Sequence, residues 1–280
     1  MNGVLERTLG ILELLCQHGE GMELAAIADQ LGIPRSAVHR LLADLMRCGY
    51  VRQTREHGEH LLTTKLIAMG LSFLSNSGIV DISQPLLDRL AEISGELVRL
   101  SVVDGNRLTW VARAQGARQG LRYDPDMGAD ARLSCSASGL AWMAALSDDE
   151  ALALLAQQGL GKPEEYGPNA PASMQAVMAM VEETRQRGFA VTEETYTAGL
   201  NAMGAVVRVG NQPPLGVLTI AGPSVRFTRE RMLALADDLQ ALAGQLAATS
   251  GASPFFNKTM PRPAELPAES ADGRKPIYAP

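Results

Sequence analysis

The stretch LAAIADQLGIPRSAVHRLL, residues 24–42, decides the fold of the first part of the chain. Its opening residues place apolar side chains on one helical face. Gly32-Ile33-Pro34 then turns the chain, with glycine as a helix stop and proline near the next start. A second apolar face follows at spacings i, i+3, i+4 and i+7, formed by Val38, Leu41, Leu42 and Leu45. Two short helices joined by a tight turn predict a helix-turn-helix, whose second helix fits the major groove of DNA.

The residues on either side complete this unit. Leucines at helical spacing between residues 5 and 15 predict an amphipathic first helix, which ends at the break His18-Gly19-Glu20-Gly21. Beyond Gly49, the run 50–53, a polar turn at 56–59 and a short return at 60–62 predict a two-stranded wing. Residues 1–63 are therefore predicted to form a winged helix-turn-helix DNA-binding domain.

Charge is distributed unevenly along the chain. The net charge is −6 and the pI is near 5.3, yet six basic residues oppose three acidic ones between residues 32 and 66. Phosphate neutralisation by basic residues is the main source of affinity for DNA. In isolation, an ordinary solvated helix face would explain these side chains equally well, but three helices, a wing and a linker beside them favour DNA binding. The candidate DNA contacts are Arg35, Ser36, His39 and Arg40 on the second helix of the motif, with Arg52 and Arg55 on the wing.

The remaining chain predicts a larger second domain. Residues 64–78 predict a linker helix, and residues 79–250 alternate helical patterns with strand-like runs, so we expect an α+β fold around a mostly antiparallel sheet. Residues 251–280 are rich in proline and have little apolar periodicity, which predicts a disordered tail. The strand-like runs are 96–103, 107–112, 189–191, 205–209 and 215–220, and the last helical pattern covers 229–248.

Composition excludes several classes of protein. No apolar run approaches the roughly 20 residues of a membrane span, and the N-terminus lacks the pattern of a secretion signal, so we expect a cytoplasmic protein. Cys16, Cys48 and Cys135 lie too far apart for a disulfide framework or a zinc site of the usual spacing. The sequence therefore predicts no metal site and no cofactor.

An enzyme is an alternative, because Ser134-Cys135-Ser136-Ala137-Ser138-Gly139 could place a nucleophile at a helix start. The usual partners of such a nucleophile are absent, since no histidine follows His60 and the chain has no G-x-S-x-G or S-x-x-K motif. We therefore predict no catalytic residue. A further alternative is a metabolite sensor that acts through protein contacts. The arginines of the first domain argue against it, because an interface of that kind would present hydrophobic anchors.

Seven ordered segments are together more specific than any single motif. They are RTLGIL at 7–12, AAIADQLGIPRSAVHRLL at 25–42, CGYV at 48–51, RGFA at 187–190, EE at 193–194, AGL at 198–200 and IAGP at 220–223. On these segments the chain resembles the IclR family of transcriptional regulators, from about Val4 to Ala248. The resemblance implies a winged-helix reader, a linking helix and a GAF-like domain that binds a small metabolite. It also implies assembly as a dimer, or a dimer of dimers, on a palindromic operator.

The same resemblance implies where an effector would bind. The family's pocket lies where a helix opened by a segment like 133–141 faces segments like 191–194 and 199–203. Members that bind small oxo-acids have an acidic residue in place of Thr192, an Arg-Cys pair in place of Asn201-Ala202 and a lysine in place of Leu140. The loss of these polar groups implies a larger or more apolar effector, such as an aromatic carboxylic acid. The nominated residues are Tyr123, Leu133, Ser136, Ala137, Ser138, Thr192, Leu200, Asn201 and Ala202.

Two features of this region have a second explanation. Ser136 and Ser138 are equally well explained as N-caps of the following helix. The arginines at 113, 118, 122 and 132 are candidates for meeting a carboxylate, but a solvated loop face explains them as well.

Overall fold

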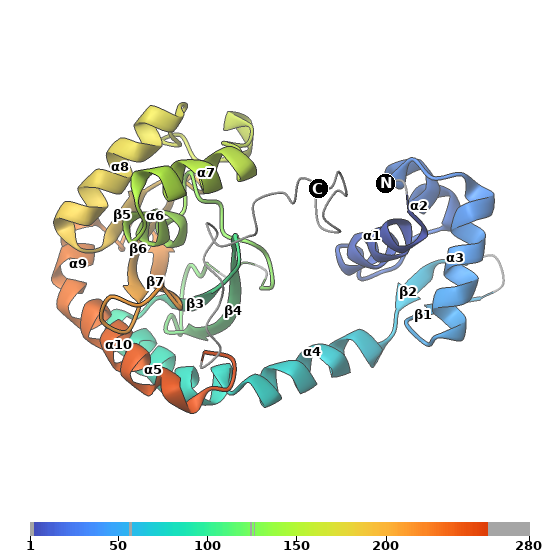
Figure 1. Ribbon diagram of the computed structural model, residues 1–280, viewed down its shortest axis with the longest axis horizontal. Helices are drawn as coiled ribbons and strands as arrows, with labels where there is room; N and C mark the ends of the chain where they lie inside the picture. Colours follow the sequence, from blue (N-terminus) through green and yellow to red (C-terminus); the bar gives the residue numbers. More distant parts are fainter. Residues whose placement is uncertain (1–2, 56–57, 124, 126, 257–280) are drawn as a thin grey trace, which may run out of the picture. The chain divides into compact units, whose positions relative to one another are not determined.

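The computed structural model describes residues 3–55, 58–123, 125 and 127–256 (Figure 1). Two compact units meet in the chain between Asn76 and Ser77. Among the described residues, no single helix is long and apolar enough to cross a membrane; Thr64–Ser77 and Ile79–Ser94 reach that length and composition only when the two are counted together across their break.

The first unit is a winged helix-turn-helix. Gly32 ends the second helix in the left-handed conformation, with φ at 63°, a value that costs glycine little. The third helix buries Val38, Leu41, Leu42 and Leu45, so the predicted spacing is confirmed. The wing strands pair antiparallel, with Arg52 opposite Leu61. The elements are α1 (Val4–Cys16), α2 (Leu24–Leu31), α3 (Arg35–Arg47), β1 (Val51–Gln53), β2 (His60–Leu62) and α4 (Thr64–Ser77).

The first helix differs from its expected packing. Ile11 and Leu15 enter the core of the first unit, whereas Leu5 and Leu9 are 71% and 48% exposed. The face of α1 that meets α2 and the wing is set by Ile11 and Leu15. Within a single copy of the chain, part of the apolar stripe of α1 therefore remains exposed to solvent.

The second unit is built on one antiparallel sheet, as the sequence predicts. Its strand order is β4-β3-β7-β6-β5, and every neighbouring pair runs antiparallel. The strands are β3 (Leu97–Asp104), β4 (Arg107–Gln115), β5 (Ala190–Glu193), β6 (Leu200–Val207) and β7 (Gly216–Pro223).

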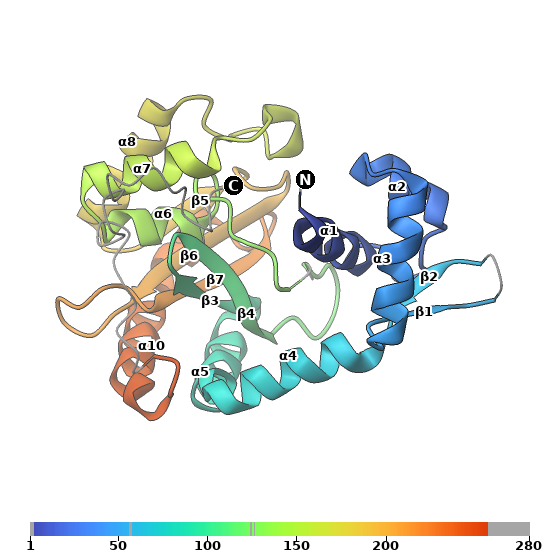
Figure 2. The same cartoon turned by 45° about the vertical axis from the view of Figure 1, so that its right-hand side comes forward.

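Helices cover both faces of this sheet, with α5 and α10 on one side and α6, α7 and α8 on the other (Figure 2). Alternate residues of β3 face opposite layers: Val98, Leu100 and Val102 join the core with α5 and α10. The helices are α5 (Ile79–Ser94), α6 (Ala137–Ala144), α7 (Asp148–Gln158), α8 (Met174–Arg187), α9 (Arg229–Ala234) and α10 (Ala236–Thr249), with short 3-10 turns at Pro163–Glu165 and Ser250–Ala252.

Three differences from the expected boundaries change the packing of the second unit, and β4 also runs three residues past its predicted end, to Gln115. β6 begins at Leu200, five residues early, because residues 200–204 pair with β7, and such pairing between distant segments leaves no local signal. The last helix is two helices, α9 and α10, which break at the buried Leu235. The packed chain also extends beyond residue 250, since the hydroxyl of Ser253 is buried and donates to the Ser77 carbonyl at 2.6 Å. The rest of the predicted tail, 257–280, lies outside the described residues.

Candidate nucleic-acid interface and effector pocket

The outer face of α3 carries four of the predicted DNA contacts. Arg35, Ser36, His39 and Arg40 are all exposed, because the opposite face of the same helix is buried in the core. Arg35 lies 3.9 Å from Asp29, and both side chains are more than two-thirds exposed, so this ion pair is weak and solvated. The helix therefore presents polar and basic groups one turn apart on a single face.

The wing presents the other two predicted contacts. Arg52 lies on β1 and Arg55 follows in the wing turn, and both are exposed. Residues 56 and 57 of that turn lie outside the described residues. The turn is held by Thr54, whose hydroxyl donates to the Glu59 carboxylate at 3.0 Å. A basic wing beside a basic helix is the arrangement with which a winged helix-turn-helix contacts a groove and its flanking phosphates.

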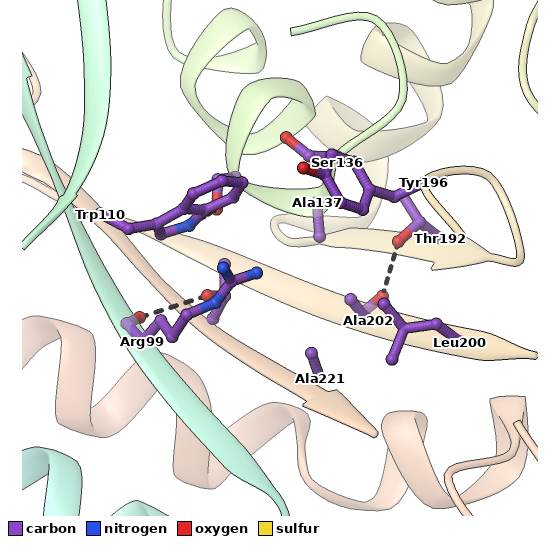
Figure 3. A pocket seen from close by; sticks show the side chains of 11 residues that line it. Arg99, Trp110, Ser136, Ala137, Thr192, Tyr196, Leu200, Ala202 and Ala221 are labelled. Carbon is purple, nitrogen blue, oxygen red and sulfur yellow. Dashed lines mark hydrogen bonds between the residues drawn. The ribbon is translucent and has the colours of Figure 1, made fainter. Parts of the chain in front are cut away.

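A narrow pocket opens in the second unit, between the sheet and the start of α6 (Figure 3). Its cavity volume, the space open to the centre of a water molecule, is about 20 Å³, so the pocket is tight. Strands β3, β4, β5, β6 and β7 and helix α6 all contribute to it. The lining is Arg99, Trp110, Ser136, Ala137, Ser138, Thr192, Tyr196, Leu200, Ala202, Thr219 and Ala221.

The start of α6 is held against the loop that precedes it by local contacts. The Ser136 hydroxyl accepts from the Gly139 amide at 3.0 Å and donates to the Arg132 carbonyl at 2.6 Å, so it caps the helix. A Cβ at Gly139 would lie 2.4 Å from the Cα of Leu133, and only glycine allows this approach. The start of α6, which forms one wall of the pocket, therefore packs directly against the backbone of residues 132 and 133.

Several hydroxyl groups in the pocket are engaged by the protein. Thr192 donates to the Ala202 carbonyl at 3.2 Å, and Thr219 donates to the Arg99 carbonyl at the same distance. Ser138 accepts from the indole N–H of Trp110, also at 3.2 Å. These bonds fix the walls and leave a surface that is largely apolar.

The exception is the guanidinium of Arg99. It stacks on the indole of Trp110, with its Cζ 3.9 Å from the ring centroid, and a second ring, that of Tyr123, lies 5.8 Å away. The residue is 5% exposed, and burial lowers the pKa of Arg99. A buried cation thus faces the pocket across an aromatic wall.

Comparisons with known proteins bear on both units. Residues 4–55 match the IclR helix-turn-helix domain, and residues 71–248 match the bacterial transcriptional regulator IclR C-terminal domain. The chain belongs to the IclR family. Its members are transcriptional regulators, and the helix-turn-helix makes this chain a DNA-binding one.

One curated relative is the acetate operon repressor of Salmonella typhimurium, which is 29% identical over 232 residues, covering 82% of this chain and 84% of that protein. A similar solved structure is an IclR transcriptional regulator from Alicyclobacillus acidocaldarius, with a TM-score of 0.75 and 20% identity over 88% of this chain and 97% of that one. Another is an IclR homolog from Microbacterium hydrocarbonoxydans complexed with 4-hydroxybenzoate, with a TM-score of 0.73 and 16% identity over 90% of this chain and 100% of that one.

Six of the nine effector residues nominated from the IclR resemblance line the pocket, and three do not. Leu133 is buried behind the pocket, where it packs under Gly139. The side chain of Asn201 leaves the sheet on the other side and donates to the Phe227 carbonyl at 2.9 Å. Tyr123 lies beside the pocket, next to Arg99. The six in the lining are Ser136, Ala137, Ser138, Thr192, Leu200 and Ala202.

Sequence reasoning missed the charged group of this IclR-family pocket. The arginines at 113, 118, 122 and 132 were the candidates, and none of them lines it. Arg99 does, and the signal was a single basic residue inside the run Leu97–Val103, whose other residues are apolar except for Ser101. Trp110, Tyr196, Thr219 and Ala221 were also missed, because their place at the pocket depends on strand pairing.

The segment considered for nucleophilic catalysis is the wall of this pocket. Burial raises the pKa of Cys135 to about 11, so its thiol stays protonated at neutral pH. The hydroxyls of Ser136 and Ser138 cap a helix and hold Trp110, as described above. The segment therefore has a packing role that accounts for its serines without chemistry.

Proposed function

We propose that this protein is an effector-responsive regulator of a catabolic pathway, which binds a palindromic operator in the cytoplasm and senses a small organic acid in the pocket of its second unit. The exposed basic face of α3, with Arg52 and Arg55 on the wing, carries the DNA part of this proposal. Bidentate side-chain contacts to base edges each discriminate by about 1–3 kcal/mol. Each phosphate contact adds about −0.9 to the slope of log affinity against log salt.

The operator is proposed to be palindromic because the protein is proposed to dimerise. Helix α4 exposes several large apolar side chains, among them Ile67 at 61%, Leu71 at 62% and Phe73 at 59%. A helix of that composition is normally covered. The exposed Leu5 and Leu9 of α1 extend the apolar area in the same unit. A second copy of the chain would cover it, and a two-fold dimer reads two half-sites. A dimer of dimers is the larger assembly that we propose.

The effector part of the proposal is supported by the pocket and by one neighbour in structure. The lining combines apolar walls with few polar groups, which suits a small organic molecule. The Microbacterium hydrocarbonoxydans homolog, of the same fold, is complexed with 4-hydroxybenzoate. An aromatic acid is therefore our first candidate. Such an effector must bind the DNA-competent and DNA-incompetent states with different affinity, typically by about 1–3 kcal/mol.

The test is a pull-down of genomic fragments with the purified full chain at physiological salt, repeated with a panel of small organic acids. We expect enrichment of a palindromic site that one acid increases or abolishes. Enrichment that no acid changes would remove the effector part of the proposal. No enrichment under any condition would contradict operator binding and point to a partner protein in place of DNA.

A further inference from the structure

The strongest unexplained group in the molecule is the guanidinium of Arg99. Its Nε and Nη1 atoms are buried and have no hydrogen-bond partner among the described residues. Figure 3 shows the side chain leaving β3, passing beneath Trp110 and ending inside the pocket. None of the described residues that line the pocket is acidic. The cation is thus directed into the pocket with no counter-charge from the described residues of the lining.

Such an arrangement is unfavourable unless something compensates it. A guanidinium keeps its proton in a protein, so it cannot escape burial by becoming neutral. A buried charge is normally paired and hydrogen-bonded. The unpartnered Nε–H and Nη1–H groups of Arg99 lie on different edges of the guanidinium, so each can donate one charge-assisted hydrogen bond to an oxygen of a bound carboxylate.

We propose that Arg99 is the anion anchor of the pocket, and that the effector is a monocarboxylate with a flat, mostly apolar body. This rests on the proposed function, in which the same pocket binds the effector. Trp110 fixes the plane of the guanidinium by stacking on it, so the planar donor pair is oriented before the ligand arrives.

The lining selects one carboxylate and an apolar remainder. In the part of the lining that the structure describes, Arg99 is the one charged residue, so a second carboxylate would be buried without a partner there. Ala137, Leu200, Ala202 and Ala221 form apolar walls, and most of the neighbouring hydroxyls already bond within the protein. Short side chains and an aromatic wall in a narrow pocket favour a planar ring over a branched body.

The experiment measures thermal unfolding and binding heats of the full-length protein with matched probes. The probes are acetate, benzoate, 4-hydroxybenzoate, phenylacetate and terephthalate, with benzamide as the uncharged counterpart of benzoate. We expect at least one aromatic monocarboxylate to raise the unfolding temperature and to bind at least about tenfold more tightly than benzamide or terephthalate.

Three variants test whether the carboxylate-dependent shift in unfolding temperature depends on Arg99. Arg99→Met removes the charge and keeps the length, so it should abolish the carboxylate-dependent shift. Without ligand it should unfold at the same or a higher temperature than the wild type, because an uncompensated buried charge is gone. Arg99→Lys keeps the charge and loses the planar donor pair, so its affinity should fall by about tenfold. Arg122→Met alters an exposed arginine outside the pocket and should leave the shift unchanged.

The proposal is overturned if no carboxylate of the panel binds, if benzamide binds as well as benzoate, or if the shift survives in both Arg99 variants. Should Arg99→Met fail to fold, Arg99→Lys alone decides. Pull-down of operator fragments with the ligand-free wild type and variants separates this result from the proposed function. Failure of DNA binding in all of them would contradict operator binding and leave a result on Arg99 standing.

Discussion

Arg40 on α3 and Arg99 on β3 carry the same guanidinium in opposite surroundings. Arg40 is exposed, and water and salt compensate its charge whenever DNA is absent. Arg99 is 95% buried and stacks on Trp110, and no ion pair from the described chain compensates it. The comparison shows that one residue type serves two kinds of recognition. The exposed charge suits a polyanion in salt solution, and the buried one suits a single small anion.

The largest effect that we expect tests how rigidly the wall of the pocket beside Arg99 is packed. Gly139→Ala adds a methyl group 2.4 Å from the Cα of Leu133, where backbone on both sides prevents relaxation. We expect the second unit to lose about 3 kcal/mol of unfolding free energy, measured by chemical denaturation. Gly244→Ala is the matched control, since nothing lies within 4 Å of that Cβ inside α10, and it should stabilise by up to about 1 kcal/mol. Equal effects at both sites would show that the pocket wall is loosely packed.

The second prediction concerns the exposed arginine of the comparison, Arg40 on α3. Arg40→Ala should weaken operator binding by about 1–3 kcal/mol, measured by fluorescence anisotropy with an operator fragment from the pull-down. Unfolding temperature and ligand binding should stay as in the wild type, because the side chain contributes nothing to the core. Arg208→Ala removes another exposed arginine, in the second unit, and should have no effect. Unchanged affinity in Arg40→Ala would remove α3 as the recognition helix.

The third prediction tests whether a dimer covers the apolar side chains that α4 exposes in a single chain. Leu71→Glu places a charge on the apolar surface of α4, so a dimer formed there should dissociate at least about tenfold more readily in sedimentation experiments. Leu121→Glu, at a site that is 65% exposed in the second unit, serves as the control. If Leu71→Glu dimerises like the wild type, the apolar face of α4 is not the dimer interface.

The smallest effect is a pH dependence of the first unit. Burial lowers the pKa of His60, so the folded chain binds fewer protons than the unfolded chain between the two values. Stability should therefore fall as the pH drops below about 6.5, the unfolded value, and level off below the folded one. Measuring the unfolding temperature at pH 7.5 and 5.5 checks this. His60→Gln should flatten the dependence, whereas His18→Gln should retain it.

The sequence by itself determined the first unit because its signals are local. The spacing of Val38, Leu41, Leu42 and Leu45 separates a buried face from an exposed one, and Gly32 ends the preceding helix. The candidate DNA contacts follow from that separation, since a helix buried on one side must expose the other. The predicted order of helices and strands in the second unit rests on the same local patterns.

Only the tertiary structure decided the pocket. Strand pairing places Arg99 opposite Thr219 on β7 and Arg113 on β4, and α6 then closes over that face of the sheet. Arg99 and Arg113 are direct partners across β3 and β4, so their side chains leave the same face of the sheet. Arg99 stacks on Trp110 inside the pocket, whereas Arg113 is exposed and donates to the Pro125 carbonyl at 3.3 Å. The register of pairing between segments more than a hundred residues apart is not written in any local pattern. It depends on the joint burial of the whole sheet, and that burial leaves one cation facing the pocket.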